Sequence, residues 1–177
     1  MSTQLPETTD IAIVGGGLVG SSLACALESS GYRIVLVEAA PVPAATAGFD
    51  QRKLALAAHS LDSLRQLGIL GLLATAPTAI ARIHISRVGD FGRVLLKASD
   101  YGHDAFGAVV LAQELGKALA ERVDALRHTT RICPATVVGV SSDAGGAVLK
   151  LKSSGGDRVL RARCVVAADG TNSFIRQ

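Results

Sequence analysis

Apolar runs alternate with polar and glycine-rich stretches along the chain, and their spacing predicts short strands and helices. Residues 11–14 are continuously apolar and rich in β-branched side chains, which is typical of a strand buried on both faces of a parallel sheet. A second strand is predicted at residues 33–37, where the apolar run I-V-L-V follows Arg33. Between the two, apolar residues recur at helical spacing from about Leu18 to Ser30, and Gly31 supplies a stop. The first forty residues therefore predict strand, turn, helix and strand.

The helix between these two strands has a clear apolar stripe. Val19, Leu23, Ala26 and Leu27 fall on one face at 3.6-residue spacing, so we expect this face to be buried. Ala24 is small, and we expect it where the helix crosses the sheet.

In the middle of the chain, the spacing of the apolar positions changes twice. Prolines and small residues predict a loop at 39–48, and an irregular stretch then leads into a helix that Gly68 ends. From residue 79 to 97 the apolar positions alternate, which predicts antiparallel strands joined by a hairpin at 89–92. Helical spacing returns at 109–126.

The last third of the chain is predicted to be rich in strands. Alternating or continuous apolar runs lie at residues 136–140, 147–152 and 158–168. The final segment, 169–176, could begin a helix that Thr171 or Ser173 caps. Strands, helices and a parallel pair at the start indicate a fold of the α/β class.

The turn after the first strand carries glycines at the spacing G-x-G-x-x-G, namely Gly15, Gly17 and Gly20. The first glycine allows a sharp turn, the second allows a pyrophosphate to approach the backbone, and the third allows helix and strand to pack closely. The turn leads into a helix whose first amides and dipole favour an anion. Because a strand precedes the motif and an amphipathic helix follows it, the motif predicts a dinucleotide-binding unit.

An acidic residue completes this unit. Glu38 ends the second strand, at about the separation expected for the carboxylate that holds a ribose diol. A carboxylate at this position would repel a 2′-phosphate, so the sequence disfavours NADP here.

Composition and charge exclude several classes of protein. The chain has 177 residues, of which 49% are hydrophobic and 19% charged, so a single globular domain is expected rather than a disordered or fibrous chain. Only 3% of the residues are aromatic, there is no Trp, and the net charge of +3 forms no basic block. We therefore expect no nucleic-acid partner.

The sequence also gives no sign of a membrane span or a metal site. The apolar runs are far shorter than the roughly 18 residues of a spanning helix, and the first ten residues do not resemble a signal peptide, so we expect a cytoplasmic protein. Cys25, Cys133 and Cys164 are isolated among apolar neighbours, which predicts reduced core thiols. No His lies at ligand spacing from another His or a Cys, so no metal is expected.

Three stretches together resemble the aromatic-ring flavoprotein monooxygenases, and within them the ubiquinone-biosynthesis hydroxylase group that includes 2-octaprenyl-6-methoxyphenol hydroxylases. The first stretch is the glycine turn with Glu38. The second is D-x-R-x-x-A-L at residues 50–56, and the third is A-D-G at 168–170. Between them, the segment from D-Y-G at 100–102 to the V-V pair at 109–110 is also similar. The resemblance covers essentially the whole chain.

The resemblance implies FAD as the cofactor and assigns further residues to it. Arg52 would face the FAD pyrophosphate, or else be an ordinary surface arginine. Asp169 and Gly170 would meet the ribityl and pyrophosphate region, or else form a common Asp-Gly turn. Gln113 would point its polar side chain towards the flavin, or else be a polar residue at the start of a helix.

The activity that the resemblance implies is hydroxylation of a polyprenylated phenol of ubiquinone biosynthesis by reduced FAD and O₂, with NAD(P)H as a possible electron donor. Other ubiquinone-biosynthesis proteins are possible partners, and a lipid-tailed substrate is compatible with a peripheral position at the inner membrane. No catalytic residue can be named from the sequence. Leu111 stands where related hydroxylases often have a glutamate, so the substrate side is not defined.

The expected organisation is a Rossmann-like FAD-binding (ββα) core with an inserted antiparallel layer. We expect a flexible lead-in at residues 1–9 and the N-terminal part of an FAD-binding domain at 10–177, within which 79–97 belongs to the substrate-side layer. Relatives carry a later G-D-A-A-H element that this sequence lacks, so the enzyme is expected to be truncated. Two alternatives stay open, namely a non-catalytic nucleotide-binding fragment that needs a second half, and an NAD-dependent dehydrogenase.

Overall fold

The computed structural model describes residues 6–41, 52–89 and 91–176. It divides into two compact units, one made of Met1–Gly48 with Leu119–Gln177, and the other of Phe49–Ala118. Both units combine helices with strands, so the predicted α/β class is confirmed.

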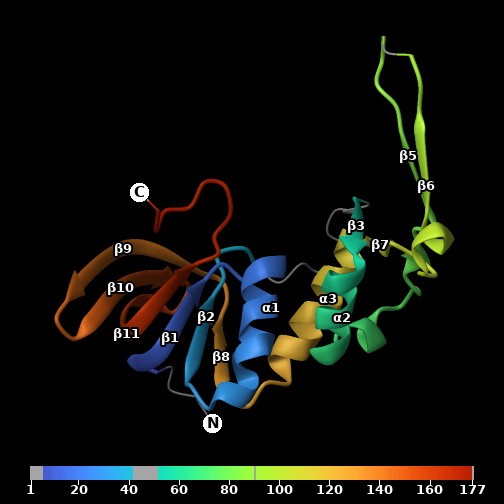
Figure 1. Ribbon diagram of the computed structural model, residues 1–177. Helices are drawn as coiled ribbons and strands as arrows, with labels where there is room; N and C mark the ends of the chain where they lie inside the picture. The colour runs from blue at the N-terminus through green and yellow to red at the C-terminus, as the bar shows by residue number, and fades with distance from the viewer. Residues whose placement is uncertain (1–5, 42–51, 90, 177) are drawn as a thin grey trace. The chain divides into compact units, whose positions relative to one another are not determined.

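The first unit is built on a six-stranded sheet with the order β8-β2-β1-β11-β10-β9. Strands β8, β2, β1 and β11 pair in parallel, and β11, β10 and β9 pair antiparallel (Figure 1). The strands are β1 (Thr8–Val14), β2 (Ile34–Val37), β8 (Thr129–Ile132), β9 (Ala135–Asp143), β10 (Gly146–Ser153) and β11 (Gly156–Ala167). Strand β1 begins at Thr8, so pairing in the sheet starts inside the lead-in expected at residues 1–9.

Strand β11 belongs to both parts of this sheet. Its first half pairs antiparallel with β10, where Leu160 lies opposite Leu149. Its second half pairs in parallel with β1, where Cys164 lies opposite Ile11 and Ala167 opposite Val14. The carboxyl ends of β1 and β11 therefore meet at the same edge of the sheet.

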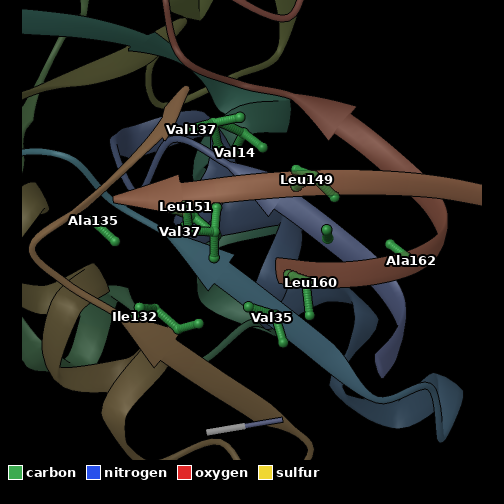
Figure 2. Packing of buried hydrophobic residues seen from close by; sticks show 11 residues of the cluster. Val14, Val35, Val37, Ile132, Ala135, Val137, Leu149, Leu151, Leu160 and Ala162 are labelled. Atoms are coloured by element: carbon green, nitrogen blue, oxygen red, sulfur yellow. The ribbon is translucent and has the colours of Figure 1, made fainter. Parts of the chain in front are cut away.

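A hydrophobic core joins the parallel strands to the antiparallel layer. Figure 2 shows β10 crossing β2, and Val35 and Val37 of β2 share one buried cluster with Leu149 and Leu151 of β10. Leu160 of β11 belongs to the same cluster. These side chains alternate along their strands, as expected for one face of a sheet packed against another layer.

Helix α1 (Leu18–Leu27) lies against β1 and β2, and a 3₁₀ turn at Glu28–Ser30 ends at Gly31 in the left-handed conformation, as the sequence predicts. The predicted stripe was wrong, because Val19 is 73% exposed and Ala26 is exposed. The buried residues of α1 are Gly20, Ser21, Ala24 and Cys25. Small side chains let the helix lie close to the sheet. This close packing, and not the apolar stripe, determines which face of α1 is buried.

The second unit contains the three-stranded antiparallel sheet β3-β7-β4 and a separate β5-β6 hairpin. Its elements are β3 (Lys53–Ala57), α2 (Ala58–Gln66), β4 (Thr78–Ala79), β5 (Arg82–Ile85), β6 (Val94–Lys97), β7 (Gly107–Leu111) and two 3₁₀ turns (Leu70–Leu72 and Ala98–Tyr101). Helix α3 (Ala112–Asp124) starts in this unit. Residues 109–111, expected to be helical, are part of β7, and β3 stands where an irregular stretch was expected.

Several smaller expectations can be compared with the described residues. The segment 168–176 forms turns instead of a helix, although the Ser173 hydroxyl accepts the hydrogen bond from the Arg176 amide that a cap would accept (3.1 Å). The cysteines are unpaired, but only Cys25 is buried, and Cys164 is exposed, so the expectation of three core thiols was wrong. None of the described helices has the length and apolar character needed to cross a membrane.

Candidate functional site

The carboxyl ends of β1, β2 and β11 border a cleft of about 410 Å³ in the first unit. The sequence-predicted residues that line it are Gly15, Gly17, Glu38, Asp169 and Gly170. A cleft at the carboxyl ends of parallel strands is where α/β folds bind ligands. The structure therefore brings together five of the eight predicted site residues.

The three glycines of the turn differ in the space around them. A Cβ on Gly15, which has φ +104°, would lie 2.3 Å from the carbonyl oxygen of Ala168, and a Cβ on Gly20 would lie 1.9 Å from the carbonyl oxygen of Gly15. No described heavy atom lies within 4 Å of a Cβ on Gly17, which faces the cleft. Gly15 and Gly20 are thus required by the fold itself, whereas Gly17 leaves room for a ligand.

The start of α1 is free to receive an anion. The Ser21 amide donates to the carbonyl oxygen of Gly17 (3.0 Å), and among the described residues no side chain caps this end of the helix. The first turn of α1 contains no acidic residue. The dipole and the unpaired amides of a helix start favour negative charge, such as that of a phosphate.

Glu38 is fixed at the edge of the cleft by hydrogen bonds to both its carboxylate and its backbone. Oε2 accepts from the Gly16 amide (2.5 Å), and Oε1 accepts from the Ala40 amide (2.7 Å). The Glu38 amide donates to the carbonyl oxygen of Ile132 (3.0 Å), and its own carbonyl oxygen accepts from the Ala135 amide (2.8 Å). Each carboxylate oxygen keeps a lone pair for a hydroxyl donor, as a ribose diol requires.

Asp169 holds the segment that follows β11. Its Oδ2 accepts from the Phe174 amide (2.8 Å) and from the Ile175 amide (3.5 Å). Burial opposes ionisation, but the nearby Ser173 hydroxyl and the backbone amides outweigh it and lower the pKa of Asp169 below its usual value. Its Oδ1 is buried and has no hydrogen-bond partner among the described residues. Asp169 therefore presents an ionised carboxylate with an unused acceptor beside the cleft.

A second hollow of about 280 Å³ shares Gly17 and Glu38 with the cleft. Ser21, Arg131 and Cys133 also line it. Arg131 is paired with Asp124 (2.9 Å), so its charge is already partly compensated. The two hollows meet at Glu38, which gives an extended ligand room on both sides of this carboxylate.

Other predicted residues lie in the second unit or outside the described residues. Arg52 precedes β3, and its carbonyl oxygen accepts from the Ala112 amide (2.9 Å). Gln113 is the second residue of α3, near the helix start as expected. Asp50 lies outside the described residues. The assignment of the eight predicted residues to FAD binding stays a prediction.

The cleft also contains residues that the sequence did not single out. Thr136, Asn172 and Phe174 line it. Asn172 and Phe174 lie two and four residues after the A-D-G motif, so the motif was a signal that could have been extended. Thr136 had no such signal, because its place depends on how β9 follows β8.

These residues fit FAD. The space beside Gly17 at the start of α1 is open, because a Cβ there would meet no described atom within 4 Å. This is the space that a pyrophosphate would need. Glu38 and Asp169 offer carboxylate oxygens to hydroxyl groups, and the buried Oδ1 of Asp169 has no partner in the described part of the chain. A carboxylate for a ribose and another for a ribityl chain suit a flavin dinucleotide.

Comparison with known proteins gives relatives of this chain. It is 33% identical over 174 residues to the ubiquinone hydroxylase UbiL of Rhodospirillum rubrum, which is 97% of this chain and 39% of that protein. It is 31% identical over 173 residues to the 3-demethoxyubiquinol 3-hydroxylase of Escherichia coli, covering 97% of this chain and 44% of that protein. The chain thus spans about two fifths of the length of these relatives.

Solved structures share the fold. The p-nitrophenol 4-monooxygenase PnpA from Pseudomonas putida superposes with a TM-score of 0.79 at 20% identity, over 97% of this chain and 43% of that one. The flavin-dependent monooxygenase PieE, solved with FAD and substrate, gives a TM-score of 0.77 at 21% identity, over 95% and 31% of the two chains. At these identities the likeness concerns the fold alone.

A family model confirms the resemblance predicted from the sequence. The model, described as FAD binding domain, matches residues 8–177, which is nearly the whole chain. This match favours FAD over the NAD-dependent alternative. The chain belongs to the FAD binding domain family.

Proposed function

We propose that this chain is the FAD-binding part of a monooxygenase that hydroxylates a polyprenylated phenolic intermediate of ubiquinone biosynthesis. The observation that supports it most is the cleft at the carboxyl ends of β1, β2 and β11, where Gly17, Glu38 and Asp169 meet. The names of two relatives, a ubiquinone hydroxylase and a 3-demethoxyubiquinol 3-hydroxylase, support the substrate class.

In this proposal each residue of the cleft has a separate task in holding the cofactor. The start of α1 and the open space at Gly17 receive the pyrophosphate. Glu38 accepts hydrogen bonds from the ribose hydroxyls, and Asp169 accepts from the ribityl chain. Arg52 and Gln113, in the second unit, stay proposed contacts of the cofactor, with Arg52 neutralising phosphate charge. Bound FAD supplies the chemistry that activates O₂, and the chain supplies position and orientation.

The substrate side of the proposal rests on the resemblance to the ubiquinone-biosynthesis hydroxylases, and the names of the two relatives support the substrate class. The ring carries a polyprenyl tail, the donor is NAD(P)H, and O₂ supplies the added oxygen atom. A lipid-tailed substrate favours a cytoplasmic protein that is peripheral at the inner membrane, where other ubiquinone-biosynthesis proteins are available as partners.

The cofactor part of the proposal can be tested by titrating the purified chain with FAD while following flavin fluorescence. Saturable quenching that Gly17→Val abolishes would support it, because the added side chain fills cofactor space without a described contact of its own. Circular dichroism of the variant controls for folding. A folded chain that leaves FAD fluorescence unchanged would contradict the proposal.

The substrate part needs a separate measurement. The FAD-loaded chain is incubated with NADH or NADPH, O₂ and a demethoxyubiquinol analogue with a short prenyl tail. Mass spectrometry then detects the gain of one oxygen atom. FAD binding with hydroxylation only of phenols without a prenyl tail would retain the cofactor proposal and overturn the substrate class.

A further inference from the structure

The β5-β6 hairpin has one apolar face and one basic face. Ile83 pairs with Leu96, and Ile85 pairs with Val94, so these four side chains share one face of the hairpin. The opposite face carries the pairs Arg82 with Lys97 and His84 with Leu95. The base of the hairpin is closed by a hydrogen bond from the Ala98 amide to the carbonyl oxygen of Ala81 (3.0 Å).

The apolar face is open to solvent towards the tip, whereas Ile83 and Leu96 near the base are half-buried. Ile85 and Val94 are each 53% exposed, although both lie in paired strands. Near the tip, Val88 and Phe91 are fully exposed, at 102% and 109%. A contiguous exposed apolar surface marks a place where a protein meets a partner or a membrane.

The charge of this segment identifies the kind of surface that it suits. Between Arg82 and Lys97 the sequence contains four Lys or Arg residues and one acidic residue, a net charge of +3. The whole chain also has a net charge of +3, so the remaining residues are balanced. The hairpin that exposes apolar side chains therefore carries a net positive charge as large as that of the whole chain.

Apolar side chains at a tip, flanked by cations, match the two layers of an anionic membrane surface. The apolar groups enter the boundary between headgroups and acyl chains to a depth of about 5–10 Å, and the cations remain at the phosphates. A four-residue strand is roughly 13 Å long, which is enough to place the tip at this depth while the base stays outside. A purely apolar protein partner would not account for the concentration of charge.

We infer that the β5-β6 hairpin, through residues 82–89 and 91–97, docks this protein on anionic lipid. Val88, Phe91, Ile85 and Val94 enter the interface, and Arg82, Arg93 and Lys97 contact lipid phosphates. The docking does not depend on the proposed hydroxylation. Where that function also holds, docking brings the protein to the membrane in which a polyprenylated substrate dissolves.

The inference is tested by sedimentation of the chain with vesicles of phosphatidylcholine alone or mixed with about one quarter phosphatidylglycerol. We expect binding to the anionic vesicles at least about tenfold stronger than to the neutral ones, and weakening as the salt rises towards about 1 M. The double variant Val88→Ser with Phe91→Ser and the variant Arg93→Glu should each weaken binding to anionic vesicles by about tenfold or more.

Matched controls lie on β11, where Val159 and Arg158 are also exposed. Val159→Ser and Arg158→Glu should leave vesicle binding unchanged. Equal loss in the control and hairpin variants would overturn the inference. The inference would also be overturned if the chain did not bind anionic vesicles but formed oligomers, and the double variant Val88→Ser with Phe91→Ser dissociated them. The hairpin would then be a protein interface. FAD titration of the same variants keeps this outcome separate from the proposed function.

Discussion

The carboxylate of Glu38 and the backbone amide of Gly16 are joined by a hydrogen bond of 2.5 Å, although 22 positions separate them in the chain. This bond connects the end of β2 to the glycine turn after β1. The residue proposed to hold the ribose therefore also fixes the turn that receives the pyrophosphate.

Replacing Glu38 by Ala should weaken FAD binding strongly. The change removes the acceptor for the ribose and leaves the Gly16 and Ala40 amides without their partner. Hydrogen bonds to charged groups contribute about 1.5–3 kcal/mol, so the Kd for FAD should rise by roughly 10- to 100-fold. Flavin fluorescence titration measures it, with exposed Glu121→Ala as the control. An unchanged Kd for FAD in a folded Glu38→Ala chain would show that Glu38 does not bind FAD.

Ala substitutions at Gly17 and Gly20 should separate cofactor binding from folding. Gly17→Ala meets no described atom within 4 Å, so we expect nearly unchanged stability and FAD affinity at least about tenfold lower. At Gly20, a Cβ would lie 1.9 Å from the carbonyl oxygen of Gly15, and we expect a loss of about 2 kcal/mol or more in the free energy of unfolding. Urea unfolding and FAD titration of both variants provide the comparison. Equal stabilities would show that α1 does not need a glycine at position 20.

The lowered pKa of Asp169 predicts a stability difference that depends on pH. Burial alone would raise this pKa, but the hydrogen bonds from Ser173 and the backbone amides lower it. The stabilisation is then fully present above the unfolded pKa of about 3.9 and is lost as the pH falls through the lower native value. The free energy of unfolding of the unsubstituted chain should exceed that of Asp169→Asn by a constant amount from about pH 7 to pH 5. This difference should shrink below about pH 4.

Urea unfolding of both chains across this range measures the difference. The exposed Asp157→Asn variant controls for removal of a negative charge. If the difference in free energy of unfolding between the unsubstituted chain and Asp169→Asn keeps its full size at about pH 3, ionisation of Asp169 does not stabilise the fold.

Two of the three thiols, Cys25 and Cys164, should react at very different rates. Burial raises the pKa of Cys25, and its side chain is inaccessible, whereas Cys164 is exposed. With a disulfide reagent at about pH 8, Cys164 should react at least roughly 100-fold faster than Cys25, which needs local opening. Peptide mass spectrometry identifies the labelled residue, and Cys164→Ser should remove the fast phase. Early labelling of Cys25 would contradict the packing of α1 on the sheet.

The local motif was predictable from the sequence because its parts are close together. The order of β1, α1 and β2, the stop at Gly31 and the meeting of the glycine turn with Glu38 all follow from one stretch of about thirty residues. The A-D-G motif likewise indicated that Asp169 follows a strand at the same edge.

Elements that depend on distant partners were missed. Strand β8 is only T-T-R-I, without alternation, and it is a strand because Thr129 to Ile132 pair with β2. Residues 109–111 are apolar and continue into helical spacing, so their period could not distinguish the end of β7 from the start of α3. Contact between strands that are distant in sequence decides that this segment is a strand. At Gly107 of β7, for example, a Cβ would lie 2.0 Å from the carbonyl oxygen of Leu56 in β3. No local pattern reports that approach.

The position of β11 has a consequence for synthesis on the ribosome. Strand β1 can pair with β2 as soon as residue 37 has emerged, but its other edge waits for residues 161–167. During the translation of more than a hundred intervening residues, the nascent chain therefore carries an apolar strand with an open edge, which favours pairing with other chains. This edge of β1 is therefore covered only when almost the whole chain has been made.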